Sequence, residues 1–501
     1  MDELAAARAK LTLLEAKEKQ LLKSLFDVRA AVDAQLEKID ALVRRRHRTI
    51  VCLPTELLVW IFGLCIDSHS CGEGILQQRQ QLASVSRHWR DAILHNPTLW
   101  KYISVTPHDA PSLKTRLKRS QGVSLDIVIT GWRHMLREQE LTVSLRLIIS
   151  CANRWRSLTL EENFETSAAL VISELNHAKF PSLHNVDLKS FGVTPSGDVP
   201  SPVFLSPINS PALEHFVIRD LVAPASFPAL SNLKTLDMSM FGDDFTAHLS
   251  FPALPLFSHS LTELSLCGRM DSWSLGLEGG INLPVLRMLS LWISEPRQLM
   301  EAIVAPMLED FDYSSEFVED FDSVVFARVG NRFCGVRHLS FDLASQQRHP
   351  DDACGIALCR AFPNARCVDI NADDVYLLFE HSQEPGSQGC PLNAFKNLEL
   401  LTICGSGSNW ASPWRELRGL DSLEEWLTDQ MESGQKLRVK LKGNNTFVLE
   451  GAFNTIYNQL QNCCILEVDG ISVATAIDLF TSETSSSLRA VSIASCNFSV
   501  S

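Results

Sequence analysis

A short apolar unit recurs through most of this 501-residue chain and restricts its fold more than any other feature. The unit reads apolar-x-x-apolar-x-apolar, and ten clear copies have centres spaced 20–33 residues apart. Because 45% of the residues are hydrophobic, about 9% of random windows match by chance, so single matches prove little. Counting two weaker copies at the end, the centres are Leu158, Val186, Phe216, Leu236, Leu264, Leu289, Phe311, Leu339, Val368, Leu401, Leu466 and Val491.

Proline marks the same position in five of these copies. It lies two residues before the first apolar position, at Pro181, Pro211, Pro284, Pro306 and Pro363. With 22 prolines in the chain, only about 0.5 would fall there by chance among twelve copies. The spacing and the prolines together indicate a structural repeat in which each unit supplies one short strand. An alternating segment at 123–129 predicts a further, half-buried strand before the repeats.

One unit cannot bury its apolar side alone, so neighbouring units must stack on one another. This pattern resembles the leucine-rich repeats, and the resemblance implies a curved solenoid with a parallel sheet along one face. Segments 168–178 and 471–480 are predicted to be helices that lead from the end of one strand to the start of the next. The Asn or Cys that follows the strand in that family is present at Asn163 and Cys496 and mostly missing between them. We therefore expect an irregular leucine-rich-repeat-like domain over residues 105–501.

Residues 1–48 contain neither proline nor glycine and predict a long amphipathic helix. Heptads counted from Leu4 place apolar residues at ten of the twelve a and d positions, the exceptions being Glu18 and Gln35. Such a 3.5-residue seam packs against another helix. Two alternatives remain open: self-association through a coiled coil, or folding back onto the same chain.

Charge and composition narrow the class of protein. Net charge is −14, of which residues 1–50 carry +3 and the remainder −17, and an acidic body disfavours nonspecific nucleic-acid binding. No apolar run is long enough to cross a membrane, and the acidic N-terminus does not resemble a signal peptide. Fourteen scattered cysteines suggest buried thiols in a reducing compartment. We expect a cytoplasmic or nuclear protein that binds neither nucleic acid nor membrane.

Residues 52–100 form a short helical segment with more apolar positions than one small core can use. Leu53-Pro54-Thr55-Glu56-Leu57 opens a helix, since proline suits its first turn. A polar break spans 67–74, and a second helical stretch then places Leu82, Val85 and Trp89 on one face. These surplus apolar side chains must pack on a neighbouring module or on a partner.

The same segment resembles an F-box, of the F-box-like type that is common in fungi. The matching string is Leu53-Pro54-x-Glu56-Leu57, Ile61-Phe62, Leu82-x-x-Val85-Ser86-Arg87-x-Trp89-Arg90 and Pro97-x-Leu99-Trp100. The match departs from the family at Ser86, often cysteine there, and in an insertion over 67–80 that lengthens the first interhelical loop.

The F-box resemblance implies docking to the Skp-type adaptor of a cullin-RING ubiquitin ligase. The positions that match the family's contact residues are Leu53, Pro54, Leu57, Ile61, Phe62, Val85 and Trp89. Leu99 and Trp100 are expected to close the small helical core. The alternative is that all of these residues form the interior of an ordinary helical domain.

The expected α/β architecture is therefore a long helix over 1–48, a three-helix F-box-like domain over 49–104 and the repeat domain over 105–501. The familiar nucleotide-binding, hydrolase and metal-binding motifs are missing from the sequence, so we expect no enzyme activity, cofactor or metal. We expect a substrate receptor that joins the adaptor, and through it a cullin, to an unknown protein substrate. The alternatives are a scaffold that assembles through the N-terminal helix, or an enzyme with an unfamiliar cleft.

Overall fold

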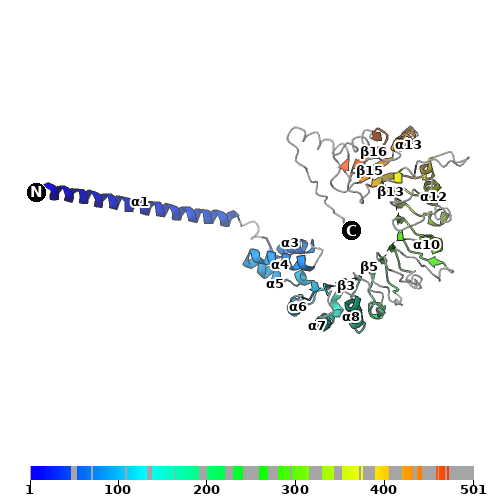
Figure 1. Cartoon of the computed structure of the whole chain (residues 1–501), viewed down its shortest axis with the longest axis horizontal. Coiled ribbons are helices and arrows are strands. Elements are labelled where there is room, and N and C mark those ends of the chain that lie inside the picture. Colours follow the sequence, from blue (N-terminus) through cyan, green and yellow to red (C-terminus); the bar gives the residue numbers. More distant parts are fainter. Residues whose placement is uncertain are drawn as a thin grey trace. The chain divides into compact units, whose positions relative to one another are not determined.

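The computed structural model divides into two units, Met1–Trp100 and Lys101–Ser501. The residues that the structure describes are 2–46, 53–68, 72–107, 110–132, 138–163, 165–190, 200–219, 230–240, 259–268, 280–293, 296–314, 326, 330–343, 353–371, 374–375, 378, 390–404, 420–432, 437–442, 459–460, 462–468 and 471–472. Figure 1 labels the main elements of both units.

The first unit begins with α1, an unbroken helix over Asp2–Arg46, so the predicted long helix is confirmed. No proline or glycine interrupts it, which leaves its backbone hydrogen bonds intact. Among the described residues after it, three short helices and a 3₁₀ turn follow: α3 (Thr55–Asp67), α4 (Gly72–Val85), α5 (Arg87–His95) and η1 (Pro97–Trp100).

The expected loop over 67–80 is wrong for most of its length, because α4 already begins at Gly72. Leu82 and Val85 also lie on a different helix from Trp89, contrary to the prediction. The break falls at Ser86, whose backbone is extended and whose Oγ accepts a hydrogen bond from the backbone N–H of Trp89 at 3.1 Å. A serine in this role caps the N-terminus of α5 and so ends the preceding helix.

The second unit is built on one large sheet, and the predicted parallel sheet is confirmed. Among the described residues it has fifteen strands, which pair in chain order and in parallel until the last strand, which is antiparallel. The strands are β1 (Tyr102–Val105), β2 (Leu125–Thr130), β3 (Trp155–Asn163), β4 (Asn185–Ser190), β5 (His215–Arg219), β6 (Thr235–Met240), β7 (Glu263–Gly268), β9 (Met288–Ile293), β11 (Asp310–Ser314), β12 (His338–Asp342), β13 (Cys367–Asn371), β14 (Leu400–Cys404), β15 (Arg438–Lys442), β16 (Ile465–Val468) and β17 (Ile471–Ser472). A separate two-stranded pair joins β8 (Ile281–Asn282) to β10 (Ile303–Val304).

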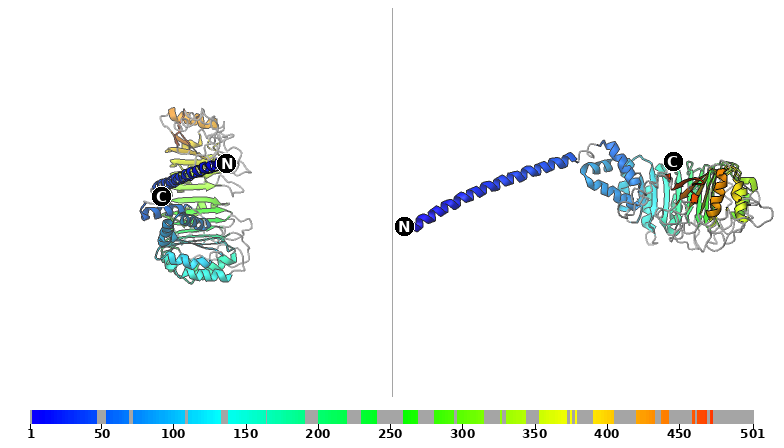
Figure 2. Two further views of the ribbon diagram at one scale, coloured as in Figure 1. Left: turned by 90° about the vertical axis from the view of Figure 1, so that its left-hand side faces the viewer. Right: turned by 90° about the horizontal axis from the view of Figure 1, so that it is seen from above.

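Helices and 3₁₀ turns connect successive strands and lie along the outer side of the strand arc in Figure 1, while Figure 2 shows the stacked strands from two further sides. They are α6 (Ala110–Arg119), α7 (Glu138–Ile149), η3 (Ala152–Arg154), α8 (Glu165–Leu175), η4 (Val203–Leu205), α10 (Pro296–Ala302), η6 (Gly330–Phe333), α12 (Ala353–Ala361), η8 (Pro391–Ala394) and α13 (Leu420–Glu432). The predicted return helix at 168–178 corresponds to α8.

Two in-register rows of apolar side chains run from strand to strand and form the core. The first row joins the centres of the sequence repeat, with Leu158 opposite Val186 and Leu401 opposite Val439. The second row lies two residues further along each strand, with Leu160 opposite Leu188. Side chains two residues apart share one face of a strand, which explains why the second and third apolar positions are both buried in each of the ten clear copies.

The prolines of the repeat occupy one kind of turn. In each of the five cases, the carbonyl before the proline accepts a hydrogen bond from the first apolar residue, as from Leu183 N–H to Phe180 O at 3.2 Å. This geometry places proline second in a four-residue turn, where its fixed φ and missing N–H cost nothing. The turn then directs the first apolar side chain into the core, and Leu183 is fully buried.

Eleven copies of the repeat coincide with strands of the large sheet, while its strands β1, β15 and β17 and one domain boundary were missed. The sequence assigned residues 101–104 to the helical domain, but β1 pairs in parallel with β2 and belongs to the second unit. β15 escaped detection because Lys436 stands where the pattern requires an apolar residue, and Leu437 is buried in its place. Segment 471–480 begins as strand β17 rather than helix, and its remainder, like the copy at Val491, lies outside the described residues.

Strand β2 is buried on both faces and not half-buried as predicted. On the polar side of the strand, the Asp126 carboxylate accepts hydrogen bonds from Arg156 Nη2 at 2.6 Å and Nε at 3.0 Å. Ser157 Oγ donates a third hydrogen bond to it at 2.7 Å. These charge-assisted bonds satisfy a carboxylate that burial alone would destabilise.

Candidate docking faces

Helix α3 is apolar on two faces, only one of which is covered. Its inner face consists of Leu58, Phe62 and Ile66, which are at most 3% exposed. Its outer face carries large apolar side chains with exposed fractions between 39% and 65%, namely Leu57, Trp60, Ile61 and Leu64. The spacing of these four residues is i, i+3, i+4 and i+7, which makes one continuous stripe on a helix.

The inner face is held by aromatic and hydrogen-bonded contacts. The ring of Phe62 lies 4.8 Å from that of Trp89 on α5, tilted by 59°. The indole Nε1 of Trp100 donates to Ile93 O at 2.7 Å, and the Arg79 guanidinium lies 5.1 Å from the Trp100 ring centre. Leu99 and Trp100 are both buried, as expected for residues that close the helical core. These contacts fix the orientation of α3 and hence which face it leaves open.

The N-terminus of α3 is shaped by Pro54. Its φ of −52° leads directly into the helix, and its carbonyl accepts the first helical hydrogen bond from Leu58 N–H at 3.1 Å. Glu56 lies in the first turn, where a negative side chain complements the positive end of the helix dipole. The backbone at Pro54 therefore positions the whole outer stripe.

The predicted adaptor-binding residues fall into three groups. Pro54, Leu57, Ile61 and Val85 are exposed, and Leu53 and Trp89 are half-buried. The assignment of Phe62 to the contact surface is wrong in this structure, because its side chain is fully buried within its own unit. It fills the space between α3 and α5, so it supports the exposed stripe from beneath.

Trp60 was missed by the sequence analysis, although it is the most exposed large apolar side chain of α3. It lies three residues after Leu57, so helical periodicity alone places it on the same stripe. Together, Leu57, Trp60, Ile61 and Leu64, with Val85 as a further exposed apolar side chain of the unit, are called the α3 docking face below.

The second candidate surface is the outward row of the large sheet, which alternates with the two buried rows. Each member follows directly after a residue of the first buried row, which is a repeat centre on every one of these strands except β15, so its side chain points away from the core. Five of its twelve members are acidic and one is basic. In strand order from β3 to β16 they are Thr159, Asp187, Val217, Asp237, Ser265, Ser290, Asp312, Ser340, Asp369, Thr402, Lys440 and Glu467.

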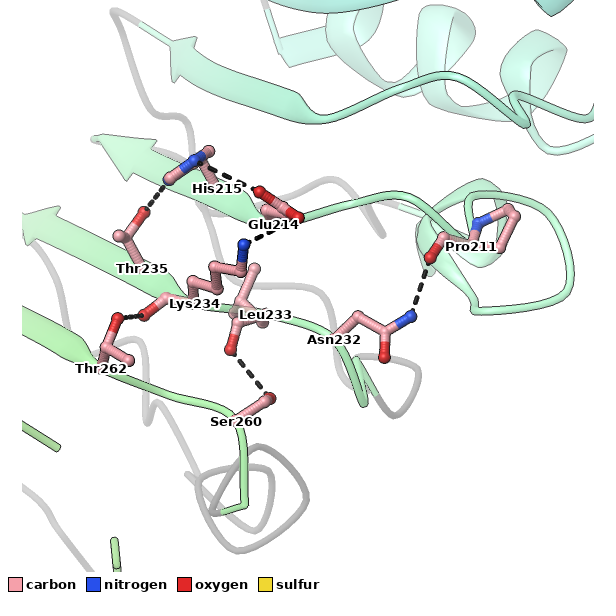
Figure 3. Close-up of polar contacts among 9 residues, drawn as sticks. All are labelled: Pro211, Glu214, His215, Asn232, Leu233, Lys234, Thr235, Ser260 and Thr262. Atoms are coloured by element: carbon pink, nitrogen blue, oxygen red, sulfur yellow. Dashed lines mark hydrogen bonds and ion pairs between the residues drawn. The ribbon is translucent and has the colours of Figure 1, made fainter. Parts of the chain in front are cut away.

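Polar contacts tie neighbouring strands together where they begin (Figure 3). Lys234 Nζ lies 2.9 Å from Glu214 Oε1, and this hydrogen bond lowers the pKa of the Glu214 carboxyl below its ordinary value. His215 Nδ1 lies 2.8 Å from Thr235 Oγ1 on the next strand. The backbone also connects these two neighbouring strands, because the N–H groups of Lys234 and Thr235 both donate to Glu214 O.

An exposed aromatic side chain interrupts the outward polar surface. Trp292 is 38% exposed, and its Nε1 donates to Asp312 Oδ2 at 3.0 Å. Ser290 Oγ donates to the same oxygen at 2.8 Å. On the neighbouring strands, His338 Nδ1 lies 2.6 Å from Asp310 Oδ1. The surface thus combines fixed carboxylates with an oriented indole, a combination suited to binding a polypeptide.

Comparison with known proteins finds no family model that matches the sequence and no curated protein with significant similarity. Across the described ranges, no helix is both long and apolar enough to cross a membrane. Within those same ranges, no three or more His, Cys, Asp or Glu side chains are grouped so that they could hold a metal ion.

Proposed function

We propose that this chain is a non-catalytic substrate receptor of a cullin-RING ubiquitin ligase, in which the α3 docking face binds the Skp-type adaptor. The observation that carries the proposal is the exposed stripe of Leu57, Trp60, Ile61 and Leu64 on a helix whose opposite face is already packed. Fully burying an exposed side chain of this kind contributes about 1.5–3 kcal/mol, and because these four are 39–65% exposed, covering each one contributes roughly half of that. Four such side chains together provide the basis of a stable interface. The F-box resemblance supplies the identity of the partner.

We further propose that the second unit is a leucine-rich-repeat-like solenoid that binds the protein substrate. Its support is the in-order parallel pairing of strands and the agreement of the sequence repeat with the buried rows. The outward row of side chains, with Trp292 beside it, is the surface we assign to the substrate. The receptor acts by proximity, because it raises the effective concentration of substrate lysines near the ubiquitin-conjugating enzyme. A cytoplasmic or nuclear location follows from this proposal.

The adaptor proposal is tested by measuring capture of a purified Skp-type adaptor by the full chain. The double substitution Leu57→Ala and Ile61→Ala removes exposed apolar area without touching the buried face of α3. We expect at least a tenfold loss of affinity, with unchanged circular dichroism. The matched control is Ile208→Ala, which trims an equally apolar, 80% exposed side chain in the other unit. Full adaptor binding by a folded double variant would overturn the proposal.

A further inference from the structure

The apolar seam of α1 is exposed along the described part of the helix. Every side chain from 3 to 42 whose exposure is described is exposed. The apolar members at positions a and d are 46–63% exposed, and apart from Ala7 they are Leu4, Leu11, Leu14, Leu21, Leu25, Val28, Val32, Ile39 and Leu42. At 1.5 Å per residue, the 45-residue helix presents this seam over about 67 Å.

We propose that α1 binds the α1 helix of a second copy of this chain, as a parallel, in-register coiled coil. The first reason is the repeat of the seam, since apolar residues that recur every 3.5 residues return to one side only when two helices supercoil around each other. A helix that packs on a globular core keeps a period of 3.6 residues and drifts away from this seam within a few heptads.

The second reason is the charge beside the seam. In a parallel pair, each residue at position g lies opposite the residue at position e that follows it by five in the other helix. This rule sets Glu3 against Arg8 of the second copy and Lys10 against Glu15 of the second copy. The remaining four g–e combinations contain no like charges. A full-length antiparallel pair sets g against g and e against e. It replaces these two attractions with Glu3 against Arg45 and Glu15 against Arg29, and it adds a repulsion between Lys10 and Lys38 that the parallel pair does not have.

The two polar seam residues also fit the parallel arrangement. Glu18 at position a faces Glu18 of the second copy, and Lys17 of the second copy lies beside it at position g, so an opposite charge offsets part of the repulsion between the two carboxylates. Gln35 at position d faces Gln35 of the second copy, and the two side-chain amides can hydrogen-bond to each other. Each polar pair lowers stability, but it also penalises a shift of one helix along the other, which fixes the register.

The mass of the full chain in solution tests the pairing. Light scattering should give twice the chain mass of 55.8 kDa for the natural sequence. Leu14→Asp places charges in the seam and should give the single-chain mass. The control is Leu13→Asp on the adjacent residue, which is 69% exposed and lies at position c outside the seam. A single-chain mass for the natural sequence, or equal loss of pairing in both variants, would overturn the proposal.

Charge exchange tests the parallel orientation. Lys10→Glu alone creates two repulsive contacts with Glu15 in the pair and should weaken the dimer about fivefold at low salt. Adding Glu15→Lys to the same chain restores opposite charges only if the helices run parallel. Recovery of the natural dimer affinity by the double variant supports the parallel pair. A double variant no better than Lys10→Glu would rule that geometry out.

Discussion

Phe62 and Trp89 hold the first unit together through rings whose centres lie 4.8 Å apart, between helices α3 and α5. Both belong to the motif that resembles an F-box, yet Phe62 is fully buried while its neighbour Ile61 is 39% exposed. Adjacent residues on a helix point about 100° apart, so Phe62 can pack in the core while Ile61, next to it in sequence, lies on the exposed face. Stability and partner binding can therefore be separated by substitution on this single helix.

Removing the Phe62 ring should destabilise the helical unit. Phe62→Ala leaves a cavity beside Trp89, and large-to-small core substitutions of this kind cost about 3–5 kcal/mol. Hydrogen exchange of the peptides from α3 to α5 should report this loss as faster opening. Trp60→Ala, on the exposed face of the same helix, should change opening by less than about 0.5 kcal/mol. Equal exchange in the two variants would contradict the assigned faces.

Gly335 should tolerate no side chain. A Cβ added there would lie 2.9 Å from the backbone oxygen of Leu308, because consecutive turns of the repeat approach closely. Gly335→Ala should therefore lower the free energy of unfolding by about 1–3 kcal/mol, as overpacking does elsewhere. The measurement is a denaturant titration against Gly122→Ala, where the new methyl group meets no atom within 4 Å. A loss of stability in the Gly122 variant alone would refute this account.

The Glu214 carboxyl should titrate below its ordinary range because Lys234 donates a hydrogen bond to it. A folded-state pKa below the unfolded one stabilises the protein above the ordinary pKa, and this contribution disappears as the pH falls through the lowered value. The effect on stability is small, since the pair is exposed. Carboxyl NMR should detect the low pKa, and Lys234→Met should raise it. Lys396→Met, at another exposed lysine, should leave it unchanged.

The Cys390 thiol should resist alkylation in the folded protein. Burial raises its pKa to about 11, and its Sγ donates to Leu378 O at 3.3 Å. Because only the thiolate reacts, little modification is expected at pH 8. The exposed Cys334 should be labelled by iodoacetamide before Cys390, which peptide mass spectrometry would measure. Labelling of Cys390 before Cys334 under native conditions would contradict its burial.

The periodic features of this protein could be read from the sequence because each depends on a local rule. Strand alternation places the second and third apolar residues of a copy on one face, and proline at Pro181 or Pro211 fits a turn whichever strands flank it. The heptads of residues 1–48 likewise predicted α1 without any knowledge of its surroundings. β15 was missed where Lys436 broke the local pattern.

Only the tertiary structure decided which apolar residues face inward. Leu57, Leu58, Ile61 and Phe62 are similarly hydrophobic, so composition cannot tell the buried pair from the exposed pair. The position of α5 determines which face of α3 is buried. Trp89 packs against Phe62, and Trp60 and Ile61 therefore point outward. Burial is a property of the neighbours that a side chain meets, and those neighbours are set by packing between helices that the sequence of one helix does not contain.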